Sequence, residues 1–215
     1  MQEVKVIKNV LEANDLIADN NRKLFKENNV FVINIISAPG AGKTTMLEKT
    51  IAELKSKLRI AVIEGDIATT RDADRLAKFD IPVVQINTEG GCHLDANMIA
   101  NSIRGLNLAQ IDLLIIENVG NMVCPAEFDV GENSKVSIIS IAEGEDKPQK
   151  YPLIFQVTDV CLVNKMDLKP YLDISVENLI SDIQSINPTL TTIKISAKTG
   201  DGLNEWHEWL MRKKG

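Results

Sequence analysis

Apolar residues near the start of the chain recur at a spacing of three to four positions. Asn, Asp, Lys and Glu occupy the positions between them, which is typical of a helix with one apolar face. The pattern predicts an N-terminal helix, and residues 1–28 are interpreted as a helical extension that precedes the main body. The apolar positions of this helix are Ile7, Val10, Leu11, Ile17, Ala18, Leu24 and Phe25.

A run of apolar, mostly β-branched residues follows, from Phe31 to Ser37. Such a run indicates a strand buried on both faces, the usual setting of a parallel sheet. Strand and helix patterns then alternate along the chain. Further strands are predicted at 60–64, 82–86, 112–117, 135–141, 159–164 and 191–196, and helices at 44–56, 71–78, 94–104, 175–186 and 203–212.

This alternation predicts right-handed β-α-β crossovers. The expected fold is therefore α/β, with a mostly parallel, doubly wound sheet flanked by helices. No internal repeat or Pro/Gly-rich linker interrupts the 215 residues, a length that suits one domain. We expect a single domain over residues 1–215.

Charge and cysteine content narrow the class of protein. The 24 Lys and Arg against 30 Asp and Glu give a formal net charge of -6, which disfavours nucleic acid or an anionic membrane as partner. No apolar run is long enough to span a bilayer, and the first residues lack a signal-peptide core, so a cytoplasmic location is expected. The odd number of cysteines, 3, favours free thiols or metal ligands over disulfides.

The segment 37–45, Ser-Ala-Pro-Gly-Ala-Gly-Lys-Thr-Thr, joins the first predicted strand to the next helix. Glycines at such a point let backbone N–H groups converge on phosphate oxygens, which predicts a P-loop NTPase fold. Lys43 is expected to reach the β- and γ-phosphates, and the Thr44 hydroxyl to bind Mg²⁺. The expected phosphate-binding residues are Gly40, Ala41, Gly42, Lys43, Thr44 and Thr45.

Two later segments at strand ends predict that the nucleotide carries guanine, as in GTP and GDP. They read Asn-Lys-Met-Asp over 164–167 and Ser-Ala-Lys over 196–198. Asp167 can accept hydrogen bonds from N1 and N2 of guanine, whereas adenine has an acceptor at N1 and no 2-amino group. Asn164 is expected to orient the loops, Lys165 to cover the base, and the Ala197 N–H to donate to O6. The base-binding set is Asn164, Lys165, Asp167, Ser196, Ala197 and Lys198.

Glu117 and Asp66, each at a predicted strand end, are candidate ligands of Mg²⁺. This ion is usually held by one or two carboxylates together with phosphate oxygens. Glu117 begins Glu-Asn-Val-Gly where GTPases usually have Asp-x-x-Gly, so Gly120 is expected near the γ-phosphate. Helix capping or ion pairing is the alternative role for each acid.

The catalytic set predicted for GTP hydrolysis is Lys43, Thr44, Asp66 and Glu117. Asn121 stands after Gly120, where a Gln could position the attacking water. Hydrolysis is therefore expected to be slow, about 10⁻⁴ per second. Arg71 or Asp72 could supply the missing group, although capping and ion pairing explain these residues equally well.

Cys92, His93 and Cys124 form a candidate site for a softer metal ion. Thiolate and imidazole ligands suit Zn²⁺ or Ni²⁺ better than Mg²⁺. A two-fold dimer could bring two copies of the set together, because its interface duplicates every ligand. The alternative is that the cysteines are structural and the histidine is only hydrogen-bonded. Cys161 lies within an apolar strand and is expected in the core.

Three segments together resemble the nickel-insertion GTPases of NiFe-hydrogenase maturation, the HypB type of SIMIBI-class P-loop GTPases. They are residues 37–45, Gly-Cys-His-Leu-Asp-Ala over 91–96, and Glu-Asn-Val-Gly-Asn-Met-Val-Cys-Pro over 117–125, and the similarity includes 143–152. The resemblance implies a GTPase that forms a homodimer with GTP and has a metal site at the dimer interface, from residues matching Cys92, His93 and Cys124. It also implies delivery of nickel to the hydrogenase large-subunit precursor with a partner metallochaperone.

One feature of some family members is missing from the first 30 residues. They contain neither Cys nor His, whereas some members have a Cys-rich or His-rich N-terminal segment for nickel. Tight nickel binding by this segment is therefore not predicted, and the interface site or a partner must hold the ion.

The leading hypothesis is a GTP-hydrolysing metallochaperone in which GTP and Mg²⁺ draw two protomers together and hydrolysis hands over nickel. The alternatives are a related GTPase for urease or cobalamin-enzyme maturation, a signalling GTPase with structural cysteines, and a small-molecule kinase, which the guanine motifs disfavour. The sequence leaves open whether the metal is Zn²⁺ or Ni²⁺, which residue positions the water, how tightly the dimer forms and which hydrogenase is served.

Overall fold

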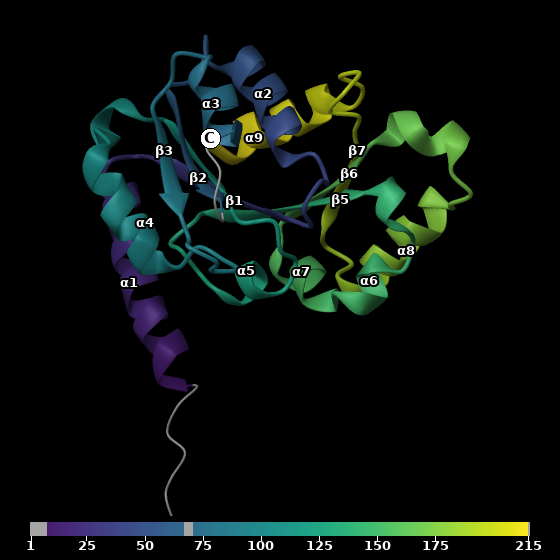
Figure 1. The fold of residues 1–215 in the computed structure, drawn as a ribbon, viewed down its shortest axis with the longest axis horizontal. Helices are drawn as coiled ribbons and strands as arrows, with labels where there is room; N and C mark the ends of the chain where they lie inside the picture. The colour runs from purple at the N-terminus through teal and green to yellow at the C-terminus, as the bar shows by residue number, and fades with distance from the viewer. Residues whose placement is uncertain (1–7, 67–70, 215) are drawn as a thin grey trace, which may run out of the picture.

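The computed structural model describes residues 8–66 and 71–214, which are built around a seven-stranded sheet (Figure 1). The strand order is β3-β2-β4-β1-β5-β6-β7, and every neighbouring pair is parallel. The predicted parallel sheet is confirmed, with each strand within two residues of its expected bounds. The strands are β1 (Phe31–Ser37), β2 (Ile60–Asp66), β3 (Val83–Asn87), β4 (Leu113–Glu117), β5 (Ser134–Ser140), β6 (Val160–Asn164) and β7 (Thr191–Lys194).

Helices cover both faces of the sheet, as a doubly wound fold requires (Figure 1). One face carries α2 (Lys43–Leu54), α3 (Arg71–Ala77) and α9 (Leu203–Lys214). The other face carries α1 (Lys8–Glu27), α4 (Ala96–Ser102), α5 (Cys124–Glu127), α6 (Lys147–Lys150), α7 (Pro152–Val157) and α8 (Val176–Ile186). Helices α5, α6 and α7 were not predicted, because four to six residues are too few to display a helical period. Among the described helices none combines the length and apolarity needed to cross a bilayer.

Alternate residues of the central strand β1 pack into opposite layers of the core. Ile33 and Ile35 face the helices α2 and α9, while Val32 and Ile36 face the other layer. On the first side, α2 and α9 are joined by a buried hydrogen bond: the Trp206 indole N–H donates to Thr50 Oγ1 at 3.0 Å. Trp206 also stacks on Trp209, with ring centroids 5.5 Å apart.

The N-terminal helix α1 buries only part of the apolar stripe that its sequence predicts, namely Ala18 and Phe25, together with two asparagines. Its buried residues are Asn14, Ala18, Asn21 and Phe25. They lie three or four positions apart and so share one face. In contrast, Leu16 is 69% exposed and Leu24 is 38% exposed, and Ile7 lies outside the described residues. The helix lies along α4 (Figure 1), so tertiary contacts select its buried face.

Candidate nucleotide and metal sites

The predicted site residues follow the carboxyl ends of the strands. In a parallel sheet these ends share one edge, and ligands bind where the strand order reverses. Here β1 lies between β4 and β5, so the loop after β1 opens at that reversal. Asp66 and Glu117 end the neighbouring strands β2 and β4, and Asn164 ends β6.

The loop after β1 has the backbone of a phosphate-binding loop. Gly42, just before α2, has a φ of 103°, a backbone conformation that residues other than glycine rarely adopt. A Cβ at this position would lie 2.4 Å from Asn164 Nδ2. Gly42 therefore lets the loop enter α2 and approach the guanine-motif loop closely.

Lys43 is held by Ser37, the residue at the end of β1 that stands where the common phosphate-loop pattern has its first glycine. Its ammonium group donates to Ser37 Oγ at 3.0 Å, and Ser37 is fully buried at the end of β1. Burial lowers the pKa of Lys43, while the charge of Glu117 opposes that shift. The serine hydroxyl thus fixes the lysine head group inside the phosphate loop.

Two buried acids lie near Thr44 at the N-terminus of α2, namely Glu117 and Glu64. The Thr44 hydroxyl donates to Glu117 Oε1 at 2.9 Å, and Glu64 is the β-sheet neighbour of Glu117 on β2. Burial raises the pKa of Glu117 to about 7 and that of Glu64 to about 8, the latter also because of the Glu117 charge.

One oxygen of each buried glutamate, Oε2 of Glu64 and of Glu117, has no hydrogen-bond partner within the described ranges. Buried polar atoms are normally satisfied, and Mg²⁺ accepts carboxylate, hydroxyl and phosphate oxygens. These residues therefore fit a hard divalent cation beside the phosphates. The sequence pattern did not identify Glu64, and its only signal was an acidic residue directly after the apolar run of β2.

Two cavities adjoin along the loop edge. One, of about 360 Å³, is lined by Gly40, Lys43, Thr44, Glu64, Asp66, Glu117 and Gly120 among others. The second, of about 310 Å³, is lined by Asn164, Lys165, Asp167, Ala197 and Lys198. Gly42 and Thr45 line both cavities, which therefore continue into one another. The first is lined by all the predicted phosphate-binding residues except Ala41, and the second by all the predicted base-binding residues except Ser196.

Asn164 connects the two loops at the base cavity. Its Nδ2 donates to the Ala41 carbonyl at 2.8 Å, and its Oδ1 accepts from the Ala197 N–H at 2.9 Å. Asp167 accepts from the Ser196 hydroxyl at 2.7 Å, and Lys165 Nζ donates to the Gly40 carbonyl at 2.7 Å. The order of these polar groups along the cavity matches the predicted guanine site, whose contacts with the base stay predictions.

Arg75 is a further charged residue of the phosphate cavity that the sequence pattern did not identify. Its guanidinium pairs with Glu48 at 2.7 Å and with Asp72 at 3.0 Å, and it donates to Thr45 Oγ1 at 3.1 Å. The pairing role considered for Asp72 is therefore found, and the neighbouring Arg71 is exposed.

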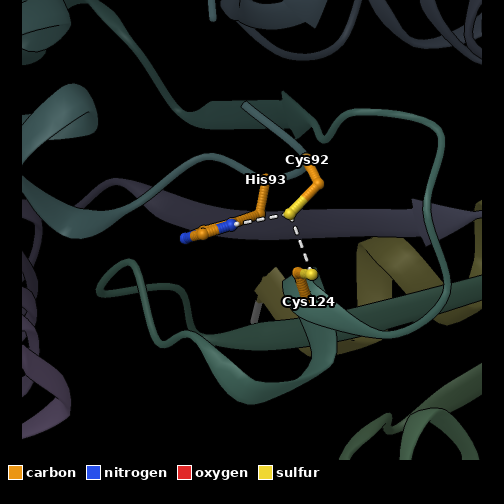
Figure 2. Close-up of side chains that lie close together, drawn as sticks. All are labelled: Cys92, His93 and Cys124. Atoms are coloured by element: carbon orange, nitrogen blue, oxygen red, sulfur yellow. Dashed lines mark hydrogen bonds between the residues drawn. The ribbon is translucent and has the colours of Figure 1, made fainter. Parts of the chain in front are cut away.

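Cys92, His93 and Cys124 come together at the same edge of the sheet, where Figure 2 shows their side chains converging. The two Sγ atoms are 2.9 Å apart, Cys92 Sγ is 3.5 Å from His93 Nδ1, and all three ligand atoms lie within 4.8 Å of one another. Burial lowers the pKa of His93, which favours the neutral imidazole that binds metals. The set fits a borderline-soft divalent cation.

The loop that carries Cys92 and His93 is tied to the nucleotide edge by Asn118. This residue is buried directly after Glu117, and its Oδ1 accepts from the Leu94 N–H at 3.0 Å. On the other side, Asn121 forms an antiparallel bridge with Ser37, the partner of Lys43. Both ligand-bearing segments therefore contact residues of the phosphate site.

Residues 31–194 match the family described as CobW/HypB/UreG, nucleotide-binding domain. The chain belongs to this family. The match begins at β1 and ends at β7, so it takes in the first cavity, the part of the second that includes Asn164 and Asp167, and the segments that carry the cysteines. The family's nucleotide-binding domain agrees with the P-loop fold described above.

Relatives within the CobW/HypB/UreG family are HypB proteins. Hydrogenase maturation factor HypB of Azotobacter vinelandii is 46% identical over 212 residues, covering 99% of this chain and 70% of that protein. The crystal structure of hydrogenase maturation factor HypB from Archaeoglobus fulgidus matches with a TM-score of 0.90 and 37% identity, over 95% of this chain and 100% of that one. The structure of HypB from Helicobacter pylori in complex with nickel gives 0.89 and 36%, over 94% and 95%. The resemblance to the HypB type is confirmed.

Proposed function

We propose that this protein is a GTP-hydrolysing metallochaperone that supports nickel insertion into the large-subunit precursor of NiFe-hydrogenase. The observation that carries the proposal is the convergence of two thiols and an imidazole beside the phosphate loop. HypB relatives of similar length support it, and one of them was crystallised with nickel. Nickel is the cargo in this proposal, and GTP is the nucleotide.

Guanine nucleotide binding follows from the polar groups of the two adjoining cavities. Asp167 would accept from N1 and N2 of the base. The Ala197 N–H would donate to O6 in exchange for its bond to Asn164 Oδ1. Lys43 would exchange its bond with Ser37 for the β- and γ-phosphates. Thr44 and Glu117, with Asp66 nearby, would hold Mg²⁺, which when bound neutralises charge on the phosphates.

Slow hydrolysis is part of the proposal. The side chain of Asn121 follows Gly120 but is engaged locally, because its Oδ1 accepts from the Val123 N–H at 2.9 Å. That bond occupies the amide oxygen that could otherwise accept a hydrogen bond from the attacking water. Arg75 lies in the cavity, but its guanidinium is already paired with two carboxylates. We expect a turnover near that of unassisted GTPases, about 10⁻⁴ per second.

Coupling between nucleotide and nickel would pass through the end of β4. Asn118 follows the Mg²⁺ candidate Glu117 and binds the backbone just after His93. A change at Glu117 on GTP binding would therefore move the segment that carries two of the three ligands. Three donors leave a coordination position open, which a homodimer formed with GTP, or a partner metallochaperone, could complete.

The test is the dissociation constant of Ni²⁺, measured by competition with a chromophoric chelator in the presence of GDP and then of a non-hydrolysable GTP analogue. We expect a difference of tenfold or more, which is about 1.4 kcal/mol of coupling. Sedimentation velocity on the same samples would report the dimer. Equal nickel affinities in the two nucleotide states would refute the switch and favour a signalling GTPase with structural cysteines.

A related GTPase for urease or cobalamin-enzyme maturation is the second candidate, because the matched family also includes UreG and CobW. The nickel titration does not distinguish it from the first. Capture of purified hydrogenase and urease precursors by the GTP-bound protein would do so. Retention of the hydrogenase precursor alone supports the first proposal, and retention of the urease protein alone supports the second.

A further inference from the structure

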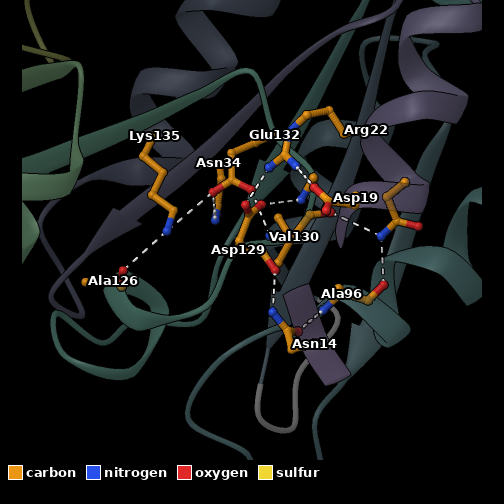
Figure 3. Close-up of polar contacts among 12 residues, drawn as sticks. Asn14, Asp19, Arg22, Asn34, Ala96, Ala126, Asp129, Val130, Glu132 and Lys135 are labelled. Atoms are coloured by element: carbon orange, nitrogen blue, oxygen red, sulfur yellow. Dashed lines mark hydrogen bonds and ion pairs between the residues drawn. The ribbon is translucent and has the colours of Figure 1, made fainter. Parts of the chain in front are cut away.

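Helix α1 directs two amide side chains into the protein. Asn14 is 6% exposed and Asn21 is 3% exposed, on the stripe where an apolar residue would pack at lower cost. A buried amide is unfavourable unless its donors and acceptors are paired. The partners of these two asparagines therefore show what α1 holds (Figure 3).

Asn14 contacts both segments that carry the metal-site residues. Its Oδ1 accepts from the Ala96 N–H at 2.9 Å, and its Nδ2 donates to the Asp129 carbonyl at 2.8 Å. Ala96 is the first residue of α4, directly after the loop with Cys92, and Asp129 follows the short helix that begins at Cys124. One side chain thus joins the backbones of the two ligand-bearing segments.

Asn21 repeats this connection about two turns further along α1. Its Nδ2 donates to the Ala96 carbonyl at 2.8 Å and to the Val130 carbonyl at 3.1 Å. Ala96 is therefore held by its N–H through Asn14 and by its carbonyl through Asn21. The same two segments are fixed at two points on one rigid helix.

The segment after α5 lies directly against α1. Gly131 has a φ of 96°, and a Cβ there would lie 2.7 Å from Asn21 Cβ and 2.8 Å from the Ala18 carbonyl. Asp129 pairs with Arg22 of α1 and accepts from the Gly131 N–H at 2.7 Å. Only glycine fits this contact, so the distance between the segment and the helix is closely defined.

The two residues that α1 holds, Ala96 and Asp129, lie close in sequence to the metal-site residues. The His93 ring lies against Phe128, with centroids 3.9 Å apart, and Phe128 directly precedes the clamped Asp129. Asp95, between His93 and the clamped Ala96, caps α4 by accepting from the Met98 N–H at 2.8 Å. A displacement of either segment on α1 would therefore reach the metal-site residues through a few rigid bonds.

We infer that Asn14 and Asn21 are positioning residues for the metal site, which set the separation of the Cys92–His93 loop from Cys124 for a thiophilic divalent cation. The inference rests on the proposed function, since it takes these three donors as the nickel site. Residues that orient metal ligands without binding the ion commonly change affinity about 10-fold to 100-fold. A helix far from the cargo thereby sets how tightly the cargo is held.

The test compares Asn14→Ala, Asn21→Ala and the wild-type chain under reducing conditions. Two readouts are taken: the Ni²⁺ dissociation constant by chelator competition, and the thiolate-to-nickel charge-transfer absorption. We expect each variant to bind Ni²⁺ about 10-fold to 100-fold more weakly with a changed absorption band. GDP affinity should stay within twofold of wild type.

Two further variants separate positioning from general destabilisation. Asn14→Gln keeps an amide donor and acceptor on a side chain one methylene longer, so it should lose less affinity than Asn14→Ala. It also serves if the alanine variant does not fold. Asn187→Ala removes a similar bond, from Nδ2 to the Phe155 carbonyl at 3.0 Å, away from both segments, and should bind nickel normally.

The outcomes of failure are distinct. Wild-type affinity and absorption in both asparagine variants would overturn the inference, as would an equal loss in Asn187→Ala. A wild-type chain that shows no thiolate-to-nickel band would instead refute the proposed nickel site itself.

Discussion

The nucleotide and metal sites share one edge of the sheet but are held in place differently. In the nucleotide site the functional groups bind one another, as in the pairs Lys43–Ser37 and Thr44–Glu117. In the metal site the candidate ligands also contact one another, but the segments that carry them are held from outside, by Asn118 and by the helix α1. Cys92 is also exposed, whereas Thr44 and Glu117 are buried.

This difference suits the two kinds of ligand. Buried, mutually paired groups are organised before the nucleotide arrives and need little rearrangement to bind it. In the proposed function the metal ion is a cargo that must also leave, so its ligands should be accessible to a partner and open to adjustment by other elements. We therefore expect changes at the nucleotide site to act on affinity directly, and changes around the metal site to act through position.

The largest effect is expected at the base cavity. Asp167→Asn removes the carboxylate that would accept two hydrogen bonds from guanine, and should weaken GDP binding at least about 100-fold. Calorimetric titration with GDP and with XDP measures it, and XDP should gain affinity. Asp201→Asn, in the nearby exposed loop, is the control. Unchanged discrimination between the two nucleotides would contradict the assigned role.

The next largest effect is expected at the metal site, where nickel affinity should fall while nucleotide affinity is kept. Cys92→Ala removes one of three donors and should weaken Ni²⁺ binding by about 100-fold or more, since even supporting residues contribute up to that amount. Guanine nucleotide affinity should stay near wild type. Cys161→Ala is the matched control, because this thiol is fully buried and burial raises its pKa to about 12. A parallel loss of GDP affinity would show that the two sites are not separable.

The third effect is a pH dependence of the free energy of unfolding, caused by the buried acid Glu64. Glu64, with a pKa of about 8 in the folded protein, keeps a proton that the unfolded chain releases near its ordinary value of about 4.3. The folded state then binds more protons between these values, so stability is fullest at low pH and falls as pH rises toward 8. Glu64→Gln should remove about 2 kcal/mol of this fall.

Urea unfolding at pH 5.5 and 8, without nucleotide and with a chelator, measures this difference. Glu205→Gln, on the exposed side of α9, should keep the wild-type dependence. Equal slopes for wild type and Glu64→Gln would mean that the carboxyl is ionised in the fold.

The smallest effect concerns the connection between the sites. Asn118→Ala removes the acceptor for the Leu94 N–H and should reduce the nucleotide-dependent change in nickel affinity by about 1 kcal/mol. Nickel titrations with GDP and a GTP analogue measure this loss, while affinity in a single nucleotide state changes less. If the full difference between nucleotide states persisted, the connection would have to run through Asn121 and Ser37 instead.

Much of the nucleotide region could be predicted from sequence because its motifs are attached to strand ends. Long apolar runs identified the strands, and a parallel sheet brings their carboxyl ends to one edge. The same reasoning indicated Cys92 and Cys124, whose sulfur atoms meet although they are 32 residues apart.

The supporting residues could not be predicted in this way. Glu64 carries no motif, and the buried face of α1 contains two asparagines whose partners lie 75 to 115 residues away in sequence. Hydrophobic periodicity shows which face of a helix is apolar. It contains no information on which distant backbone groups need a hydrogen-bond partner. That is why the predicted apolar stripe and the observed buried stripe share Ala18 and Phe25 but not the two asparagines.

The indole bond between α9 and α2 has an optical consequence. The chain has 2 tryptophans, Trp206 and Trp209, and both lie on α9 against the helix that starts with Lys43 and Thr44. Tryptophan fluorescence therefore reports on the packing of α9 against α2, the helix that follows the phosphate loop. Absorption by a nickel thiolate would report on Cys92 and Cys124. Recording the tryptophan fluorescence and the nickel-thiolate absorption in one stopped-flow mixing experiment would reveal which event comes first, binding of the nucleotide or rearrangement around the metal.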